Sequence, residues 1–400
     1  MPENSSASAP GGRFRTLLVL YLGLFLFAYT VPLMGLAKAQ ISASLGMTTT
    51  AQSWPLLGAF FLSWLIIVPP GAWLADVIGR KPLLVLGSLL LILGMLVLSY
   101  ADTLLLGCVG QFLMGAGGIL LQIIGIAAVT DLFADRRGNA LNIAVGLVGI
   151  FGLLSPVLFA ALVPLYMSWN DFYRYSAVLP GLLIVMQLVT SFPETNKKSP
   201  VVPGTVKRLL SDPVFLLLIL AMYVYGVVES GIPTWASSYL GEELGGSEQM
   251  QGWLVTGFWN LASIARLLVG LFGWGDRISY PRQIIFSSIA AIVCIVMATV
   301  PHNPQMATFF FALSGVAIAL IWPSIMTYAA QYSKAPATTV FGLIVGIGGA
   351  LGVITGSSAP GIIKEQTGLS YESLLLMLVV PFLLLILIFS FRRSDDSAKS

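Results

Sequence analysis

Twelve long apolar stretches run through the sequence, and they constrain its fold more than any other feature. A helix needs about 20 apolar residues, each rising 1.5 Å, to cross roughly 30 Å of hydrocarbon. Of all residues, 57% are hydrophobic and 9% are charged, and the mean hydropathy is +0.91. The sequence therefore predicts an all-α integral membrane protein in the lipid bilayer, with twelve transmembrane helices at 16–37, 54–75, 82–100, 104–131, 139–164, 172–192, 213–240, 251–273, 283–300, 305–331, 338–362 and 371–391.

The second half of the chain repeats the first at a spacing of about 200 residues. The matched positions are Pro32 with Pro233, Trp54 with Trp253, Gly58 with Gly257, Asp76 with Asp276, Gly115 with Gly315, and Gly146, Gly149 and Gly152 with Gly346, Gly349 and Gly352. Such a repeat indicates two pseudo-symmetric six-helix bundles with a substrate path between them. We expect the bundles at 16–192 and 213–391, a cytoplasmic linker at 193–212, a disordered cytoplasmic tail at 1–15 and another tail at 392–400.

Basic residues are distributed very unevenly between the predicted loops. With both termini inside, 16 Lys and Arg residues fall on the cytoplasmic side, 3 fall outside and 1 lies within a span. This bias sets the orientation of membrane proteins. We therefore expect a multi-pass protein of a bacterial-type cytoplasmic (inner) membrane with both termini in the cytoplasm. The net charge of +3 follows from this orientation, so it does not indicate a nucleic-acid partner.

The loop after the second predicted helix carries the most specific motif. Residues Gly71 to Lys81 read GAWLADVIGRK, which resembles the G-x-L-x-D-x-x-G-R-[RK] loop of the major facilitator superfamily. A weaker copy, GLFGWGDR, ends at Asp276 and Arg277 after the eighth predicted helix. The resemblance implies a transporter in which this loop latches one state of an alternating-access cycle. It assigns gating roles to Asp76, Gly79, Arg80, Asp276 and Arg277, with Asp131 as charge partner; the alternative is a basic cytoplasmic loop without a gating role.

Shorter segments resemble the fucose/hexose:proton symporter branch of that superfamily. They are GGILLQ ending at Gln122, DLFADRRGNALN from Asp131, GIFGLLSP ending at Pro156, YVYGVVE ending at Glu229 and WASSYL from Trp235. The branch commonly has a carboxylate in its fourth helix, where this chain has Gln122. At this position the resemblance therefore does not support proton coupling through the fourth helix.

Glu229 is the one carboxylate well inside a predicted span. It lies 16 residues beyond Pro213, about 24 Å along a helix axis. A charge at this depth costs several kcal/mol, so the side chain has to face a cavity, find a partner or take up a proton. We expect Glu229 to bind substrate and to carry the coupling proton, with Tyr29 and Tyr225 lining the path. The alternative is a carboxyl group that is hydrogen-bonded within the bundle and never titrates.

Other polar and aromatic side chains complete the predicted substrate site. Gln122 lies on one helix face with small residues, and its counterpart in the repeat is Trp322; an amide opposite an aromatic ring suits a sugar. Trp259 shares a face of the eighth predicted helix with Arg266. We expect Trp259 to contact substrate and Arg266 to brace the end of this helix near Asp276. Interhelical hydrogen bonding by Gln122 and lipid-side packing by Trp322 remain the alternatives.

Motifs for other chemistry are not found in the sequence. It has no nucleophile, metal or nucleotide motif, so we expect no enzyme, no cofactor and no metal site. We also expect a monomer. The leading hypothesis is alternating-access uptake of a small polar solute such as a sugar, coupled to protons through Glu229. Efflux of an amphipathic drug or metabolite and transport of a small organic anion are left open, as is a receptor on a transporter scaffold.

Overall fold

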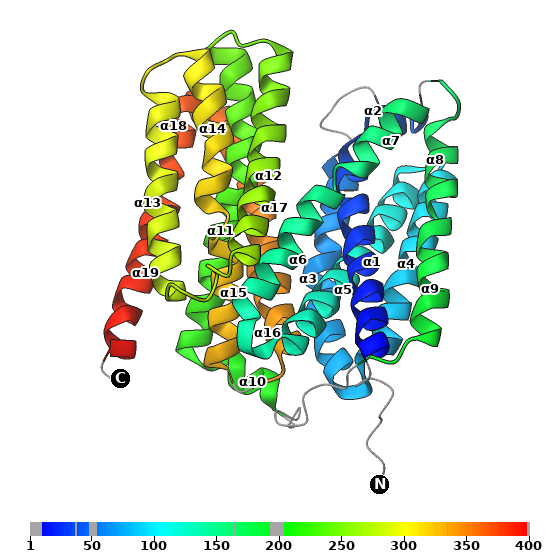
Figure 1. Cartoon of the computed structure of the whole chain (residues 1–400). Helices are drawn as coiled ribbons and strands as arrows, with labels where there is room; N and C mark the ends of the chain where they lie inside the picture. The colour runs from blue at the N-terminus through cyan, green and yellow to red at the C-terminus, as the bar shows by residue number, and fades with distance from the viewer. Residues whose placement is uncertain are drawn as a thin grey trace. The chain divides into compact units, whose positions relative to one another are not determined.

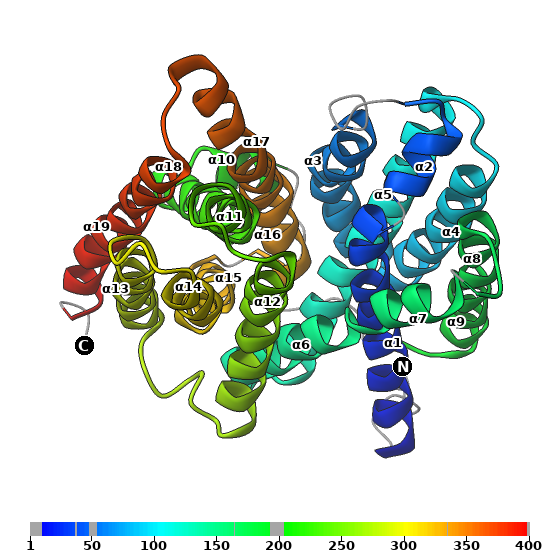
Figure 2. The same cartoon turned by 90° about the horizontal axis from the view of Figure 1, so that it is seen from above.

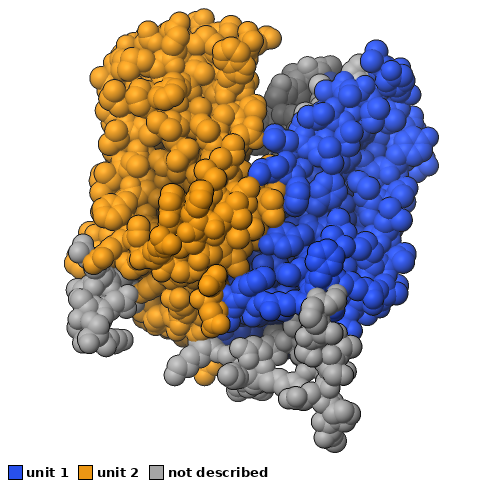
Figure 3. All heavy atoms as spheres, in the orientation of Figure 1, with its two compact units in different colours: residues 1–134, 150–203, 334–346 blue, residues 135–149, 204–333, 347–400 orange. Residues whose placement is uncertain are grey.

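The computed structural model describes residues 10–36, 38–47, 54–163, 165–192, 204–333 and 335–397, and every regular element in these ranges is a helix. Within these ranges, twelve helical segments are long and apolar enough to cross a membrane. They coincide with the twelve apolar runs, so the prediction of an all-α protein of two six-helix repeats is confirmed. By contact the chain divides into two compact units, which are coloured separately in Figure 3.

Unit 1 contains residues 1–134, 150–203 and 334–346 (Figures 1 and 3). Its helices are α1 (Pro10–Leu36), α2 (Lys38–Ser44), α3 (Trp54–Ile78), α4 (Arg80–Ser99), α5 (Leu104–Leu132), α7 (Leu154–Leu162), α8 (Trp169–Ser176), α9 (Val178–Val189) and α16 (Ala337–Leu343). The most enclosed of these is α5, which packs against α1, α3 and α4 (Figure 2). Glycines along α5 allow this close packing: a Cβ at Gly117 would lie 2.5 Å from the Gly87 carbonyl oxygen.

Unit 2 contains residues 135–149, 204–333 and 347–400. Its elements are the 3₁₀ turn η2 (Ala134–Arg136), α6 (Arg137–Phe151), α10 (Thr205–Leu210), α11 (Pro213–Ser238), the π-helix η3 (Tyr239–Glu243), α12 (Glu248–Leu271), α13 (Tyr280–Thr299), α14 (Pro304–Ile318), α15 (Ile321–Tyr332), the π-helix η4 (Ile344–Gly349), α17 (Ala350–Thr367), α18 (Tyr371–Met377) and α19 (Val379–Ser397). Three of them cross the boundary, because residues 134, 150–151 and 344–346 belong to unit 1. In this unit α11 packs against α17, α19 and α12 (Figure 2).

Each unit contains a segment from the other repeat. The α16 segment packs on α3, and a Cβ at Gly342 would lie 2.2 Å from the Cβ of Ala72. Likewise α6 packs on α12, and a Cβ at Gly146 would lie 2.7 Å from the Leu267 nitrogen. The units thus differ from the contiguous bundles expected at 16–192 and 213–391, because glycine lets these segments approach the other repeat's second helix closely.

Three expected boundary segments are partly helical. The first helix, α1, begins at Pro10 rather than at residue 16, with proline in a favoured first-turn position. The helix α10 lies inside the linker expected at 193–212, and α19 continues to Ser397, past residue 391. Residues 1–9, 193–203 and 398–400, on which the rest of these expectations fall, lie outside the described residues.

Prolines account for several interruptions within spans. A proline has no N–H to donate to the carbonyl four residues earlier, which opens the helix there. The fifth span breaks between Phe151 and Leu154, ahead of Pro156, and the tenth breaks between α14 and α15, ahead of Pro323. The eleventh span carries η4 instead, a π-helical stretch in a glycine-rich sequence.

Candidate functional site

Three polar side chains meet inside unit 2. Tyr225 donates a hydrogen bond to the Glu229 carboxylate, and Arg266 Nη2 donates to the Tyr225 hydroxyl at 2.8 Å. The same Nη2 atom lies 3.5 Å from Glu229 Oε1, which makes an ion pair. Tyr225 is fully enclosed, and the side chains of Arg266 and Glu229 are 7% and 19% exposed. Glu229 is thus the most accessible member of this group, here called the Glu229 cluster.

The backbone explains how the cluster forms. Tyr225 and Glu229 are four residues apart on α11, which places them on one helix face. Arg266 comes from α12 and donates through Nε to the Ala319 carbonyl oxygen at 2.8 Å. That carbonyl has no helical donor, because the residue four positions later is Pro323. The helix break between α14 and α15 therefore supplies a backbone acceptor that orients the guanidinium.

Charges elsewhere in the spans of unit 2 are peripheral. In its described spans, all charged residues except Glu229 and Arg266 lie within four residues of a span end. An isolated ion at membrane depth is costly, and pairing with a hydrogen-bonded opposite charge lowers that cost. Arg266 and Glu229 therefore compensate each other. The expectation that Arg266 braces the helix end near Asp276 is wrong, because its bonds go to Tyr225, Glu229 and Ala319.

The other predicted substrate residues are not part of this cluster. Tyr29 is buried in unit 1, where its hydroxyl bonds to Ser176 Oγ at 2.8 Å. Gln122, also in unit 1, is half-buried and makes no side-chain hydrogen bond to any described residue. In unit 2, Trp322 is buried and Trp259 is 42% exposed. Their contact with substrate stays a prediction.

The GAWLADVIGRK segment, expected to be a loop, is helical on both sides of Gly79 and forms a second polar cluster, in unit 1. Only Gly79 separates α3 from α4, and its φ of 99° is a conformation that L side chains rarely adopt. The turn directs Arg80 onto Asp131 at 2.5 Å, which is the expected charge pairing. Asp76 accepts from the backbone N–H of Thr339 at 2.7 Å and from its hydroxyl at 2.8 Å. Asp76 therefore caps the first turn of α16.

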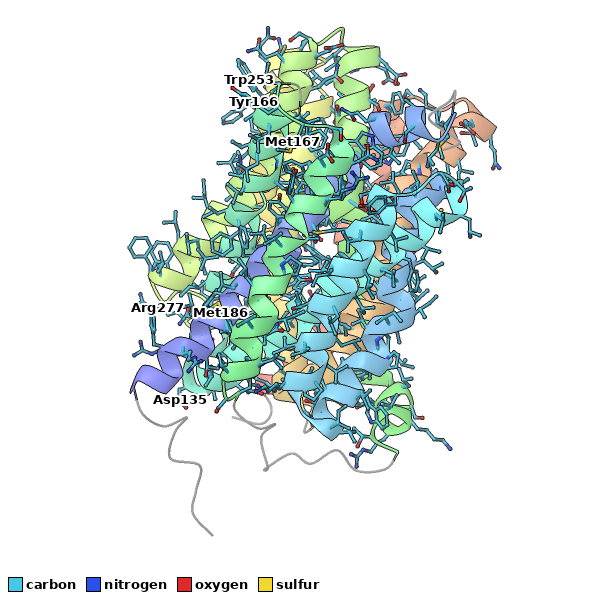
Figure 4. The ribbon with its side chains drawn as sticks, turned by 90° about the vertical axis from the view of Figure 1, so that its right-hand side faces the viewer. Asp135, Tyr166, Met167, Met186, Trp253 and Arg277 are labelled. Carbon is cyan, nitrogen blue, oxygen red and sulfur yellow. The ribbon has the colours of Figure 1, made fainter. Side chains whose placement is uncertain are left out.

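The weaker motif copy forms a matching cap in unit 2. Asp276 accepts from the backbone N–H groups of Gly138 at 2.9 Å and Asn139 at 3.1 Å, in the first turn of α6. It also accepts from the Tyr280 hydroxyl. Arg277 is exposed and makes no side-chain bond to a described residue. In Figure 4, Arg277 and Trp253 are labelled near opposite ends of the helices.

An ionisable pair also occurs at the loop before α14. His302 Nε2 lies 3.0 Å from Glu372 Oε2, and Nδ1 lies 2.9 Å from the Val300 carbonyl oxygen. The pKa of His302 is raised above its ordinary value by the Val300 carbonyl first and then by Glu372. The pair links the α13–α14 loop to the start of α18.

Sequence reasoning found Glu229 and Tyr225 but did not pair them with Arg266. Two signals were available. Arg266 and Glu229 are opposite charges set back from the ends of neighbouring spans, and Pro323 marks a free carbonyl at Ala319. Neither signal alone gives the contact, because it depends on how α11, α12 and α14 pack.

Comparisons with known proteins agree with this architecture. The Major Facilitator Superfamily profile matches residues 16–245 and 230–400. A TsgA homologue of Buchnera aphidicola is 22% identical over 392 residues, covering 94% of this chain and 97% of the relative. A TsgA homologue of Edwardsiella ictaluri is 23% identical over 310 residues, covering 76% and 75%.

Solved structures share the fold along most of the chain. The transporter FucP in its outward conformation has a TM-score of 0.76 at 16% identity, covering 94% of this chain and 98% of that one. The human organic anion transporter MFSD10 has a TM-score of 0.74 at 17% identity, covering 95% and 100%. The profile match spans nearly the whole sequence and both repeats. The chain therefore belongs to the Major Facilitator Superfamily and is a multi-pass membrane transporter of that family.

Proposed function

We propose that the protein is a proton-driven secondary active transporter of a small polar solute, with the Glu229 cluster as its coupling site. The observation that carries this proposal is the ion pair of Glu229 with Arg266, bridged by Tyr225. An ionisable group within a span is costly, and such groups commonly mark ion and substrate pathways. A related fold occurs in a fucose:proton symporter, so the architecture is compatible with proton coupling.

The coupling step follows from the contacts of Glu229. When its carboxylate is ionised, it neutralises Arg266 and accepts the Tyr225 hydrogen bond. When it takes up a proton, it no longer compensates the guanidinium, and the Arg266–Tyr225 pair is free to bind another group. Proton binding thereby changes the charge of the site. In this proposal Tyr29, Gln122, Trp259 and Trp322 line the path taken by the solute.

The two caps are the proposed gating elements. Asp76 and Asp276 each hold the first turn of a helix from the other repeat, α16 and α6 respectively. An anionic side chain at a helix N-terminus is stabilising. Release of these caps, with Gly79, Arg80, Asp131 and Arg277 around them, would free both helices for the alternate state. We place the caps, the linker and both termini on the cytoplasmic side of a bacterial inner membrane, on the charge bias of the loops, and propose that the transporter acts as a monomer.

Transport in proteoliposomes tests the coupling. An inward proton gradient should drive accumulation of solute by the wild-type protein, and Glu229→Gln should abolish that dependence while leaving gradient-independent exchange. Glu248→Gln is the matched control, because Glu248 is an exposed carboxylate at the start of α12. Full proton-driven accumulation by Glu229→Gln would overturn the coupling role. Proton-driven loss of a solute preloaded inside would identify an exporter instead.

A further inference from the structure

We propose that the solute is a small monoanion whose carboxylate takes the place of the Glu229 carboxylate on Arg266 and Tyr225. This inference rests on the proposed proton coupling and names the substrate class of the same site. One proton enters with one anion, so each transport cycle moves no net charge.

Charge balance is the first argument. With Glu229 ionised, the Glu229–Arg266 pair is neutral; with Glu229 protonated, the pair carries one positive charge inside a span. Neutral solutes leave that charge uncompensated, whereas a monoanion restores neutrality. Because uncompensated charge is costly at membrane depth, the protonated cluster favours an anion over a neutral solute of the same shape.

Within unit 2, the described side chains provide no other counter-charge at this depth. In the described side chains of α12, α14, α15 and α17, the charged residues other than Arg266 are at the ends of α12 and α17, and α14 and α15 carry none. Among the described side chains, the ionisable groups on α11 and on the elements packed against it, outside the cluster, are Lys207, Arg208, Tyr223, Tyr239, Glu242, Glu243, Glu248, Tyr328, Tyr332, Lys364, Glu365, Tyr371 and Glu372. The Lys, Arg and Glu residues among them lie near the ends of their helices.

Hydrogen-bond geometry is the second argument. Arg266 Nε is committed to the Ala319 carbonyl, which fixes the plane of the guanidinium. Its Nη2 atom and the Tyr225 hydroxyl both point to Glu229 Oε1, so two donors converge on one carboxylate oxygen. Charge-assisted bonds of this kind are stronger than neutral ones. In the proposed cycle, a second carboxylate accepts from the same donors once Glu229 has taken up a proton and released them.

The exposed fractions of the three side chains indicate the order in which proton and anion bind. Glu229 is 19% exposed, while Tyr225 is enclosed and Arg266 is 7% exposed. The carboxyl group that exchanges its proton is therefore the accessible member, and the two donors lie behind it. An anion reaches the donors from the side on which Glu229 is exposed.

Binding to the purified full-length protein provides the first test. Galacturonate and galactose are the probes, since they differ by one carboxylate. Glu229→Gln mimics the protonated side chain, so galacturonate should stabilise it thermally at neutral pH with an affinity about tenfold or more above wild type. Galacturonate should stabilise neither Arg266→Gln nor the double variant that combines Glu229→Gln with Arg266→Gln. Arg282→Gln, at an exposed position on α13, is the matched control.

The outcomes separate the alternatives. Stabilisation of Glu229→Gln by galacturonate but not by galactose supports the proposal. Equal stabilisation by both sugars, or by galactose alone, overturns it, as does galacturonate binding that survives Arg266→Gln. Arg266→Lys keeps the charge and shows whether loss of binding reflects misfolding, because a folded Lys variant should retain weak anion binding.

Flux measurements test the charge stoichiometry. Proton-driven galacturonate uptake should be unchanged by a potassium diffusion potential imposed with valinomycin. If instead proton-driven uptake of galactose is stimulated by an inside-negative potential, the anion proposal fails while the proposed proton coupling stands. If no flux responds to a pH gradient, the proposed function fails as well, and the binding result alone decides whether Arg266 holds an anion.

Discussion

Removal of the Asp76 cap should release α16 from unit 1. One oxygen of Asp76 accepts two hydrogen bonds from Thr339, at 2.7 and 2.8 Å, and the side chain is 8% exposed. Bonds to a charged group contribute about 1.5–3 kcal/mol, and a charge at a helix N-terminus contributes about 0.3–1 kcal/mol. We therefore expect Asp76→Ala to cost about 2–4 kcal/mol, whereas Asp276→Ala should cost about 1 kcal/mol because Asp276 is exposed.

Labelling of a cysteine on the capped segment measures this release. Val340 is fully buried in α16, so Val340→Cys should react with a maleimide only when the segment leaves its site. The native thiols, Cys108 and Cys294, are first changed to serine. A cost of 2–4 kcal/mol corresponds to labelling about 30-fold to 1,000-fold faster in Asp76→Ala, provided opening is a rapid equilibrium. Asp76→Asn keeps a hydrogen-bond acceptor, so its labelling rate should lie between those of the parent protein and Asp76→Ala.

Two results would refute this reasoning. One is a labelling rate in Asp76→Ala equal to that of the parent protein, which would mean that the cap does not hold the segment. The other is a larger effect from Asp276→Ala than from Asp76→Ala at Val340→Cys. That result would show that exposure does not set the strength of the two caps.

Three further changes test the packing and the polar contacts. Gly342→Ala should lower the melting temperature, with a cost of about 1–3 kcal/mol, since the new Cβ would lie 2.2 Å from a neighbouring Cβ; Gly58→Ala, with open space around it, should be neutral or slightly stabilising. Gly79→Ala should destabilise by about 1–3 kcal/mol in chemical denaturation, because of its φ of 99°. The raised pKa of His302 means that its pairing stabilises the fold below the ordinary pKa and that this contribution disappears as pH rises through the folded value. Melting curves of His302→Gln should lack that pH dependence, and a retained dependence would assign it to another group.

Much of the architecture could be predicted from the sequence, because each membrane-spanning helix needs a long run of apolar residues. In the described part of the chain, twelve apolar runs became twelve helical spans, and the motif around Asp76 falls at the junction of the second and third spans as expected. Its residues Gly71–Ile78 belong to α3 rather than to a loop, because the helix continues to the residue before Gly79. The expected pairing of Arg80 with Asp131 is also present. These features depend on local sequence and on the length needed to cross a membrane.

The contacts between helices were less predictable, since they depend on three-dimensional packing. Arg266 was expected near Asp276 and instead binds Glu229 and Tyr225, because the free carbonyl of Ala319 directs it there. The exchange of α6 and α16 between units was also missed. The matched glycines Gly146 and Gly346 were visible in the repeat, but a repeated glycine does not say against which helix it packs.

The bond between Arg266 and the Ala319 carbonyl has an evolutionary consequence. Substitution of Ala319 cannot remove a backbone oxygen, so this bond does not require a particular side chain at position 319. Pro323 is different, because any other residue there would supply an N–H that competes with Arg266 for the carbonyl. Arginine at 266 and proline at 323 should therefore be kept or lost together among relatives, although the two side chains need not touch.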